Sequence, residues 1–296
     1  MYIELGERVG FVPGGTNIGI LRNDDRHVTL VDSGLNDTTA RKVLRVVRDE
    51  LGSEVIAILN THAHADHFGA NAFVHKRTGC EVWAPEVEAT ILAHPILQPA
   101  LLYGGADPVD ALRGRFLLAE PSPITGCLAA GKQSFMGLGL QLVPLDGHSP
   151  NQMGIVFDGV FFCADVVFPD AAIEKYRIPY LYGLTRHLDA LTRSLDVACD
   201  AVVPGHGSHH GSIEEPVARN RAAIDRTLEA VIAALKAPRS TDNVCAIVFA
   251  ALDVPVEDAQ GYYLLRPTIA AYLAHLERNG EIELEVRDRE ALWRCR

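Results

Sequence analysis

Eight residues, Asn60 to His67, constrain this chain more than any other segment, because they include three histidines and an aspartate. They follow Val55 to Leu59, a continuous apolar run that is typical of a strand covered on both faces. Imidazole and carboxylate groups are natural ligands of Zn²⁺ and related divalent ions. The segment therefore predicts a metal site at the end of a buried strand.

The spacing within this segment separates its four candidate ligands into two pairs. His62 and His64 lie two positions apart, and in an extended chain such side chains share a face. We therefore expect them to bind the same ion. Asp66 and His67 are adjacent, so their side chains diverge and are predicted to serve a different ion.

Three further candidate ligands stand where later apolar strands give way to turns. These residues, each with the strand expected before it, are His148 after Leu140–Leu145, Asp165 after Val160–Cys163, and His206 after Ala201–Pro204. Loops at strand ends commonly carry site residues. The remaining histidines lack such a motif and are expected to be ordinary surface or core residues: His27, His75, His94, His187, His209, His210 and His275.

Composition excludes several classes of protein. The chain has 296 residues, 48% of them apolar, and a net charge of −11 from 27 basic and 38 acidic residues. An acidic surface repels phosphate backbones and anionic lipid, so neither nucleic acid nor a membrane is an expected partner. The first ten residues do not resemble a signal peptide. The six cysteines are dispersed without a CxxC pair, which favours a reducing, cytoplasmic location.

The chain divides into two parts by pattern. Residues 1–212 alternate short strands with helices, including a helix over 38–51 that Asp37 is expected to cap. Pro95–Pro123 reads as a loop-rich insertion with short helices. Residues 213–296 predict three helices, over 214–236, 243–252 and 267–278, and then a hairpin, which is the order of a winged-helix module.

The order of the motifs resembles that of the metallo-β-lactamase superfamily, in particular its glyoxalase II-like binuclear hydrolases. The shared elements are HxHxDH at 62–67, GHS at 147–149, an aspartate after an apolar strand at 165, and PGHG at 204–207. The resemblance covers residues 1 to about 210. It implies an α/β (α+β) fold, an αββα sandwich of two mixed sheets flanked by helices, with the site along one edge.

The resemblance also implies a ligand set for two divalent ions, with zinc as the first choice and manganese or iron as alternatives. One ion would be held by His62, His64 and His148, and the other by Asp66, His67 and His206, with Asp165 bridging both. Asp32, in Asp32-Ser33-Gly34, would contact a ligand rather than a metal. A metal-bridging hydroxide would attack the substrate, and Asp66 would help to orient or transfer a proton.

The substrate implied by this resemblance is a small thioester, ester or lactone. In glyoxalase II-like members a basic residue and a tyrosine after the bridging aspartate contact glutathione, and Lys175 and Tyr176 fall near that place. Two alternatives use much of the same ligand pattern: a phosphodiesterase or nuclease, and a mononuclear-iron enzyme of the persulfide dioxygenase type. The expected recognition helix of the winged-helix part, Thr268 to Arg278, has Arg278 as its one arginine or lysine. This composition favours a structural or dimerising appendage over DNA binding, and a homodimer is one of the two alternatives.

Overall fold

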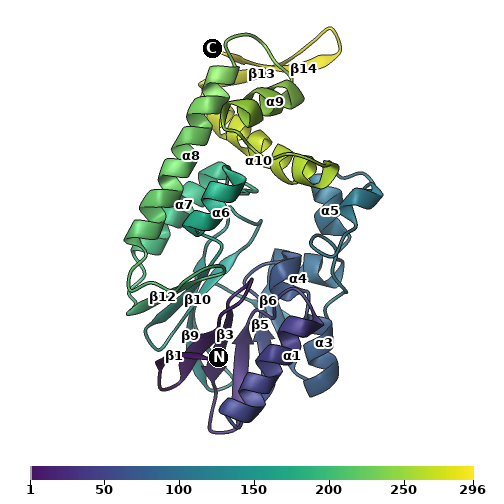
Figure 1. The fold of residues 1–296 in the computed structure, drawn as a ribbon. Helices are drawn as coiled ribbons and strands as arrows, with labels where there is room; N and C mark the ends of the chain where they lie inside the picture. Colours follow the sequence, from purple (N-terminus) through teal and green to yellow (C-terminus); the bar gives the residue numbers. More distant parts are fainter. Residues whose placement is uncertain (1) are drawn as a thin grey trace.

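The computed structural model describes residues 2–296, in which two β-sheets pack face to face between layers of helices (Figure 1). Apolar side chains of both sheets share one buried cluster, which includes Phe11 and Leu21 from the first sheet and Ile155 and Phe162 from the second. The expected αββα sandwich of two mixed sheets is therefore confirmed.

The first sheet has seven strands in sequence order, of which the first four pair antiparallel and the last four pair parallel. Its strands are β1 (Ile3–Gly6), β2 (Val9–Val12), β3 (Ile18–Arg22), β4 (His27–Val31), β5 (Glu54–Leu59), β6 (Glu81–Pro85) and β7 (Gly126–Leu128). Parallel strands need crossover connections. Helices α1 (Asp37–Arg45), which continues as a π-helical turn over Val46–Glu50, and α3 (Asn71–Thr78) supply two of them.

The second sheet has five strands in the order β12-β11-β10-β9-β8, and only β11 and β12 pair parallel. Its strands are β8 (Gly131–Phe135), β9 (Leu138–Pro144), β10 (Met153–Phe157), β11 (Val160–Ala164) and β12 (Ala201–Pro204). Asp158 and Gly159 join β10 to β11 with positive φ angles of 45° and 76°. This geometry suits a tight hairpin turn of the primed type, as the Asp-Gly pair predicts.

The C-terminal part contains three helices followed by a hairpin, in the expected order. The elements are α8 (Glu214–Ala234), α9 (Thr241–Ala251), α10 (Ala259–Arg278), β13 (Ile282–Arg287) and β14 (Glu290–Cys295). This part shares a buried core with the outer face of the second sheet, to which Phe161 and Cys163 contribute from β11 and Tyr272 and Leu276 from α10. In Figure 1, α10 extends from this core across the molecule to α5 (Leu97–Leu102), which it contacts.

Several elements differ from the sequence-based expectations. Asn36 rather than Asp37 caps α1, because its side chain accepts hydrogen bonds from the backbone of Thr38 and Thr39. Helix α10 begins eight residues before the expected Pro267, because Asp258 caps an earlier start by accepting from Gly261. Six elements were not expected: β1, β7, β8, α2 (Ala65–Phe68), α4 (Glu86–Ala93) and α6 (Asp170–Tyr176).

Those unexpected strands are short and lie at or near sheet edges, where alternating apolar residues are not required. The insertion 95–123 does contain short helices, α5 and a 3₁₀ turn at Asp110–Leu112, as predicted. Among the helices of residues 2–296, none combines the length and the apolar character that a membrane span needs.

Candidate metal centre

The candidate ligands lie in loops at one edge of the sandwich, and each is positioned by the end of a strand. After β5 the chain stays extended to His64, which precedes the one-turn helix α2 (Ala65–Phe68). The helical turn carries Asp66 and His67, and the His67 ring still packs against that of His62, with ring centroids 4.1 Å apart. Strands β11 and β12 are parallel neighbours, so they end at the same edge and bring Asp165 and His206 together.

The first group of donors consists of His62, His64 and His148. His64 Nδ1 lies 3.0 Å from His62 Nε2 and 2.8 Å from His148 Nε2. Two of these rings are oriented by their other nitrogen: His148 Nδ1 donates to the carbonyl of Tyr180, and His62 Nδ1 lies 3.0 Å from Thr61 Oγ1. Since the Thr61 hydroxyl gives its one proton to Asp32, it accepts from His62. The Nε2 atoms of both rings are therefore free to bind a metal.

The second group consists of Asp66, His67 and His206. His206 Nε2 lies 3.4 Å from His67 Nε2 and 3.3 Å from Asp66 Oδ2. His67 Nδ1 donates to Asp32 Oδ2 at 2.8 Å, and His206 Nδ1 donates to the carbonyl of Gly15 at 2.5 Å. Both rings thus also present an unprotonated Nε2 to the site when neutral.

Asp165 lies between the two groups. Its Oδ2 is 3.5 Å from His148 Nε2 and 3.2 Å from His206 Nε2, and its Oδ1 is 3.5 Å from His67 Nε2. Asp165 is buried, and within residues 2–296 its Oδ1 has no hydrogen-bond partner. A buried carboxylate oxygen without a donor is costly unless a cation faces it. The donor set therefore fits divalent metal ions.

Glycine permits this close approach. A Cβ at Gly205, in the PGHG motif, would collide with Asp165 Oδ1 and would lie 2.8 Å from His67 Cε1. Ala164, directly before Asp165, has a φ of 50°, an unfavourable conformation for a residue with a Cβ. The Asp165 carboxylate thus lies against a backbone position that leaves no room for a Cβ, at Gly205, and follows a residue with an unfavourable φ, Ala164.

The surroundings hold the two groups in different protonation states. Burial lowers the pKa of His64 to about 4 and that of His148 to about 3, and it also lowers the pKa of His62. Burial would lower the pKa of His67 and His206 too, but nearby carboxylates, above all Asp165, raise these values to about 10 and about 12.

The same contacts that raise the pKa values of His67 and His206 lower those of the two carboxylates, Asp66 and Asp165. Burial would raise the pKa of Asp66 and Asp165, but the histidines beside them, His67 and His206, hold both pKa values below the usual range. Both side chains are therefore ionised at neutral pH, which is the form that binds a metal.

Asp32 lies behind His67, where the resemblance places it. It is buried and accepts hydrogen bonds from the Thr61 backbone at 2.8 Å, the Thr61 hydroxyl at 2.9 Å and His67 Nδ1 at 2.8 Å. A single carboxylate thus orients one ring from each group, because Thr61 also contacts His62. Its φ of 63° is one that aspartate tolerates better than most residues do.

Glu88 is a site residue that sequence reasoning missed. This buried carboxylate on α4 accepts hydrogen bonds from Ala63 N at 2.9 Å, Ser149 Oγ at 2.7 Å and Asn151 N at 2.7 Å. Ala63 separates His62 from His64, and Ser149 follows His148, so Glu88 joins the two segments that carry the first group. The only signal in the sequence is an acidic residue within an apolar helix.

The other histidines lie apart from the two groups. His27 pairs with Asp24, His75 hydrogen-bonds the carbonyl of Cys80, and His275 hydrogen-bonds Thr185. His187 is buried, and no described residue hydrogen-bonds either of its ring nitrogens.

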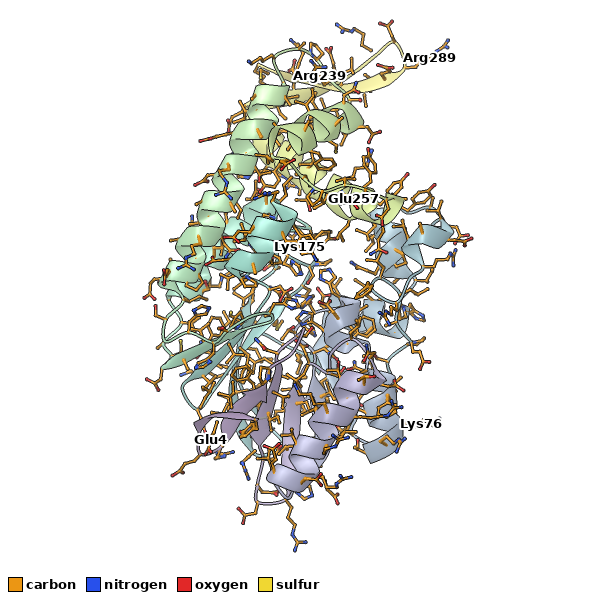
Figure 2. All side chains as sticks on the ribbon, in the orientation of Figure 1. Glu4, Lys76, Lys175, Arg239, Glu257 and Arg289 are labelled. Atoms are coloured by element: carbon orange, nitrogen blue, oxygen red, sulfur yellow. The ribbon has the colours of Figure 1, made fainter. Side chains whose placement is uncertain are left out.

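A cavity of about 440 Å³ opens beside His64. Its described lining residues come from α5, α10, the 149–150 turn and the segment 180–186, and Lys175 and Tyr176 are not among them. Those two residues are exposed at the end of α6, with the Lys175 ammonium 4.7 Å from the centre of the Tyr176 ring. Figure 2 shows Lys175 near the middle of the molecule, between the sheets and α10.

The sandwich and the converging donors define the class of protein: an αββα fold with a metal site at the edge of its sheets. Residues 11–206 match the family model described as the metallo-beta-lactamase superfamily, and the chain belongs to this superfamily.

Curated relatives are hydroxyacylglutathione hydrolases. The enzyme of Thiobacillus denitrificans is 27% identical over 146 residues, which are 49% of this chain and 44% of that protein. The chain thus matches less than half of that relative's length. The hydroxyacylglutathione hydrolase GloC of Haemophilus influenzae is 24% identical over 196 residues, 65% of this chain and 86% of that protein. Both of these relatives are hydrolases by name.

Solved structures share the fold along the whole chain. A beta-lactamase domain protein from Burkholderia ambifaria covers all of this chain and 93% of its own, with a TM-score of 0.80 at 21% identity. A metallo-beta-lactamase family protein from Thermus thermophilus covers 97% of this chain and 98% of its own, with a TM-score of 0.74 at 20% identity. At these identities the likeness concerns the fold alone.

Proposed function

We propose that this protein is a binuclear metal-dependent hydrolase that cleaves a small thioester, ester or lactone. One ion binds His62, His64 and His148, and the other binds Asp66, His67 and His206. The observation that carries this proposal is Asp165. Its Oδ2 lies near His148 of the first group and His206 of the second, and its Oδ1 has no hydrogen-bond partner among residues 2–296. Imidazole and carboxylate donors suit zinc best, and manganese and iron are the alternatives.

The bound ions would supply an activated water and would stabilise negative charge on the substrate carbonyl oxygen. The chain's own residues fix the geometry of this reaction. Asp165 and Asp66 are ionised metal ligands. The Asp66 side chain remains 36% exposed, so it can accept a hydrogen bond from the attacking water and orient it. Water adds to the acyl carbon, the bond to sulfur or oxygen breaks, and the products are a carboxylic acid and a thiol or alcohol.

The relatives named above support a thioester as the first substrate to test. Lys175 and Tyr176 are proposed substrate contacts on the resemblance alone. Both residues are exposed on α6 and neither lines the cavity beside His64, so the residues of that cavity are better candidates for substrate contacts.

We also propose the division into a catalytic part, 1–212, and a winged-helix-like part, 213–296, that borders the substrate cavity. Helix α10, the expected recognition helix, contacts α5 and lines that cavity. This placement supports a small-molecule substrate over nucleic acid as the partner, and it leaves a homodimer to be tested by light scattering. The proposed location is the cytoplasm, because the six cysteines, all free within residues 2–296, suit a reducing compartment.

Metal analysis and a substrate panel test the proposal together. We expect about two zinc, manganese or iron ions per chain and turnover of thioesters, esters or lactones by the metal-loaded protein. One iron per chain with oxygen uptake would instead indicate the persulfide dioxygenase type. Turnover of phosphodiesters alone would indicate a phosphodiesterase or nuclease.

A further inference from the structure

Part of the wall of the cavity beside His64 lies outside the residues that match the superfamily. That match ends at residue 206, whereas α10 contributes Arg266, Pro267, Ala270, Ala271, Ala274 and Arg278 to the lining. In Figure 1, α10 crosses from the C-terminal core to α5. Substrate selectivity that depends on α10 therefore comes from the C-terminal part of the chain, outside the matched residues.

The charged groups of this cavity have one sign. Apart from His64, the charged side chains among its described lining residues are Arg186, Arg266 and Arg278, and none of these lining residues is acidic. The whole chain carries a net charge of −11, so a purely cationic lining runs against the average of the molecule.

The three arginines differ in how far their charges are already paired. Arg266 Nε donates to Asp242 Oδ1 at 2.6 Å, so its charge is compensated. Arg186 Nη1 lies 3.7 Å from Asp146 Oδ2, beyond hydrogen-bonding distance. No acidic side chain of residues 2–296 forms an ion pair with Arg278. Arg186 and Arg278 therefore retain donors for an anionic ligand.

A contact between two helices relates the positions of these two arginines. Thr185 Oγ1 and His275 Nδ1 are hydrogen-bonded at 2.9 Å, which joins α7 (Leu184–Leu195) to α10. Arg186 follows Thr185 directly. Arg278 lies three residues after His275 on α10, whereas Arg266 lies nine residues before it, so Arg186 is nearer to Arg278 than to Arg266 along α10.

The face of α10 between the arginines is small and apolar. Arg266, Ala270, Ala274 and Arg278 recur every four residues, so they share one face that is about 18 Å long. The small alanine side chains leave room in the cavity, and Leu101 and Leu102 of α5 add apolar surface to its lining. A substrate lying here would contact this apolar face and, near Arg278, a guanidinium group that no acidic side chain of residues 2–296 pairs with.

We infer that the substrate carries an anionic group, a carboxylate or a phosphate, that Arg186 and Arg278 bind while the bond to be cleaved lies near His64. This inference rests on the proposed function and adds to it the substrate's charge. Arginine suits such an end group because its planar donors match the oxygens of carboxylates and phosphates.

Binding of uncleavable analogues tests the inference without turnover. We would titrate the metal-loaded protein in a calorimeter with S-butyl-3-mercaptopropionate and with its neutral amide. The carboxylate should bind about tenfold more tightly, as expected for a charge-assisted contact, and the difference should shrink at high salt. Arg278→Gln should reduce this ratio, whereas the control Arg289→Gln, at the far hairpin tip in Figure 2, should not. Equal binding of acid and amide, or no binding of either, would overturn the inference.

Kinetics with matched thioesters identify the source of the charge. The pairs are S-butyryl-3-mercaptopropionate and its amide, S-butyrylpantetheine with and without its 4′-phosphate, and glutaryl and butyryl thioesters of one neutral thiol. At least one anionic member should have a kcat/KM about tenfold above its neutral partner, and Arg278→Gln should reduce that ratio. Hydrolysis of both members at equal rates would refute the anionic preference alone. Hydrolysis of none would refute the proposed function and leave the calorimetry to decide the charge.

Discussion

The metal centre and the cavity beside it are built from different kinds of sequence information. The metal donors follow strands, and most occur in short motifs whose spacing already separates two groups. The cavity walls come from α5 and α10, elements far apart in the sequence that meet only through tertiary packing. Short local segments therefore determine the metal donors of this protein. Its proposed selectivity depends instead on how the C-terminal part packs over the site.

The largest effect is expected at the residue common to both groups of donors. Asp165→Ala should reduce the metal content below that of the wild type and turnover to the uncatalysed background, because both groups lose a donor together. Metal analysis and kcat/KM on the best substrate measure this. Wild-type metal content and activity in the variant would contradict the proposed bridging role.

Asp32→Asn should weaken metal binding without removing a donor. The substitution keeps the shape at a φ of 63°, which asparagine also tolerates, but it removes the charge that orients His67. We expect the affinity of the second group to fall by about 10-fold to 100-fold, with a smaller loss in the first group. Competition with a chelator for each ion measures this, and equal losses in both groups would contradict the assignment.

Glu88→Ala should affect stability as well as metal affinity. Removing this carboxylate leaves two buried donors, on Ala63 and Ser149, and one partly buried donor, on Asn151, without their acceptor. The free energy of unfolding should fall by about 3 kcal/mol, and the affinity of the first group by about tenfold.

Glu86→Ala is the matched control, because Glu86 is exposed on the same helix. Its effect on urea unfolding should stay within about 0.5 kcal/mol. A Glu88→Ala variant as stable as this control would show that the carboxylate does not join the two segments.

The smallest effect is a pH dependence that distinguishes the two groups. Before metal binding, His67 and His206 are protonated at neutral pH, since their pKa values are raised to about 10 and about 12, whereas His64 and His148 are neutral. Metal must displace the protons of the second group, so its affinity should fall as the pH falls, while that of the first group changes little.

Calorimetry at about pH 7.5, in buffers of different ionisation enthalpy, measures this directly. Filling the second group should release up to about two protons, and filling the first should release none. Equal proton release for the two groups would contradict the pKa assignment.

The sequence predicted more of the metal centre than of the cavity, for a physical reason. Strand ends and metal motifs are local, so the positions of His62, His64 and Asp165 relative to their strands follow from short segments. Glu88 was missed because its role arises only when α4 packs against two loops, which no pattern in EVEATILA reveals.

The cavity residues were missed for the same reason. The expectation for Arg278 concerned DNA, whereas the fold places Arg278 and Arg186 in the lining of one cavity. Likewise, α10 begins earlier than Pro267 suggested, since a capping contact at Asp258 outweighs the helix-breaking tendency of proline.

Anomalous diffraction from crystals of the metal-loaded protein tests the central claim most directly. The account predicts two peaks about 3.5–4 Å apart, with the Asp165 carboxylate between them. A single peak, or peaks that lie away from Asp165, would contradict it.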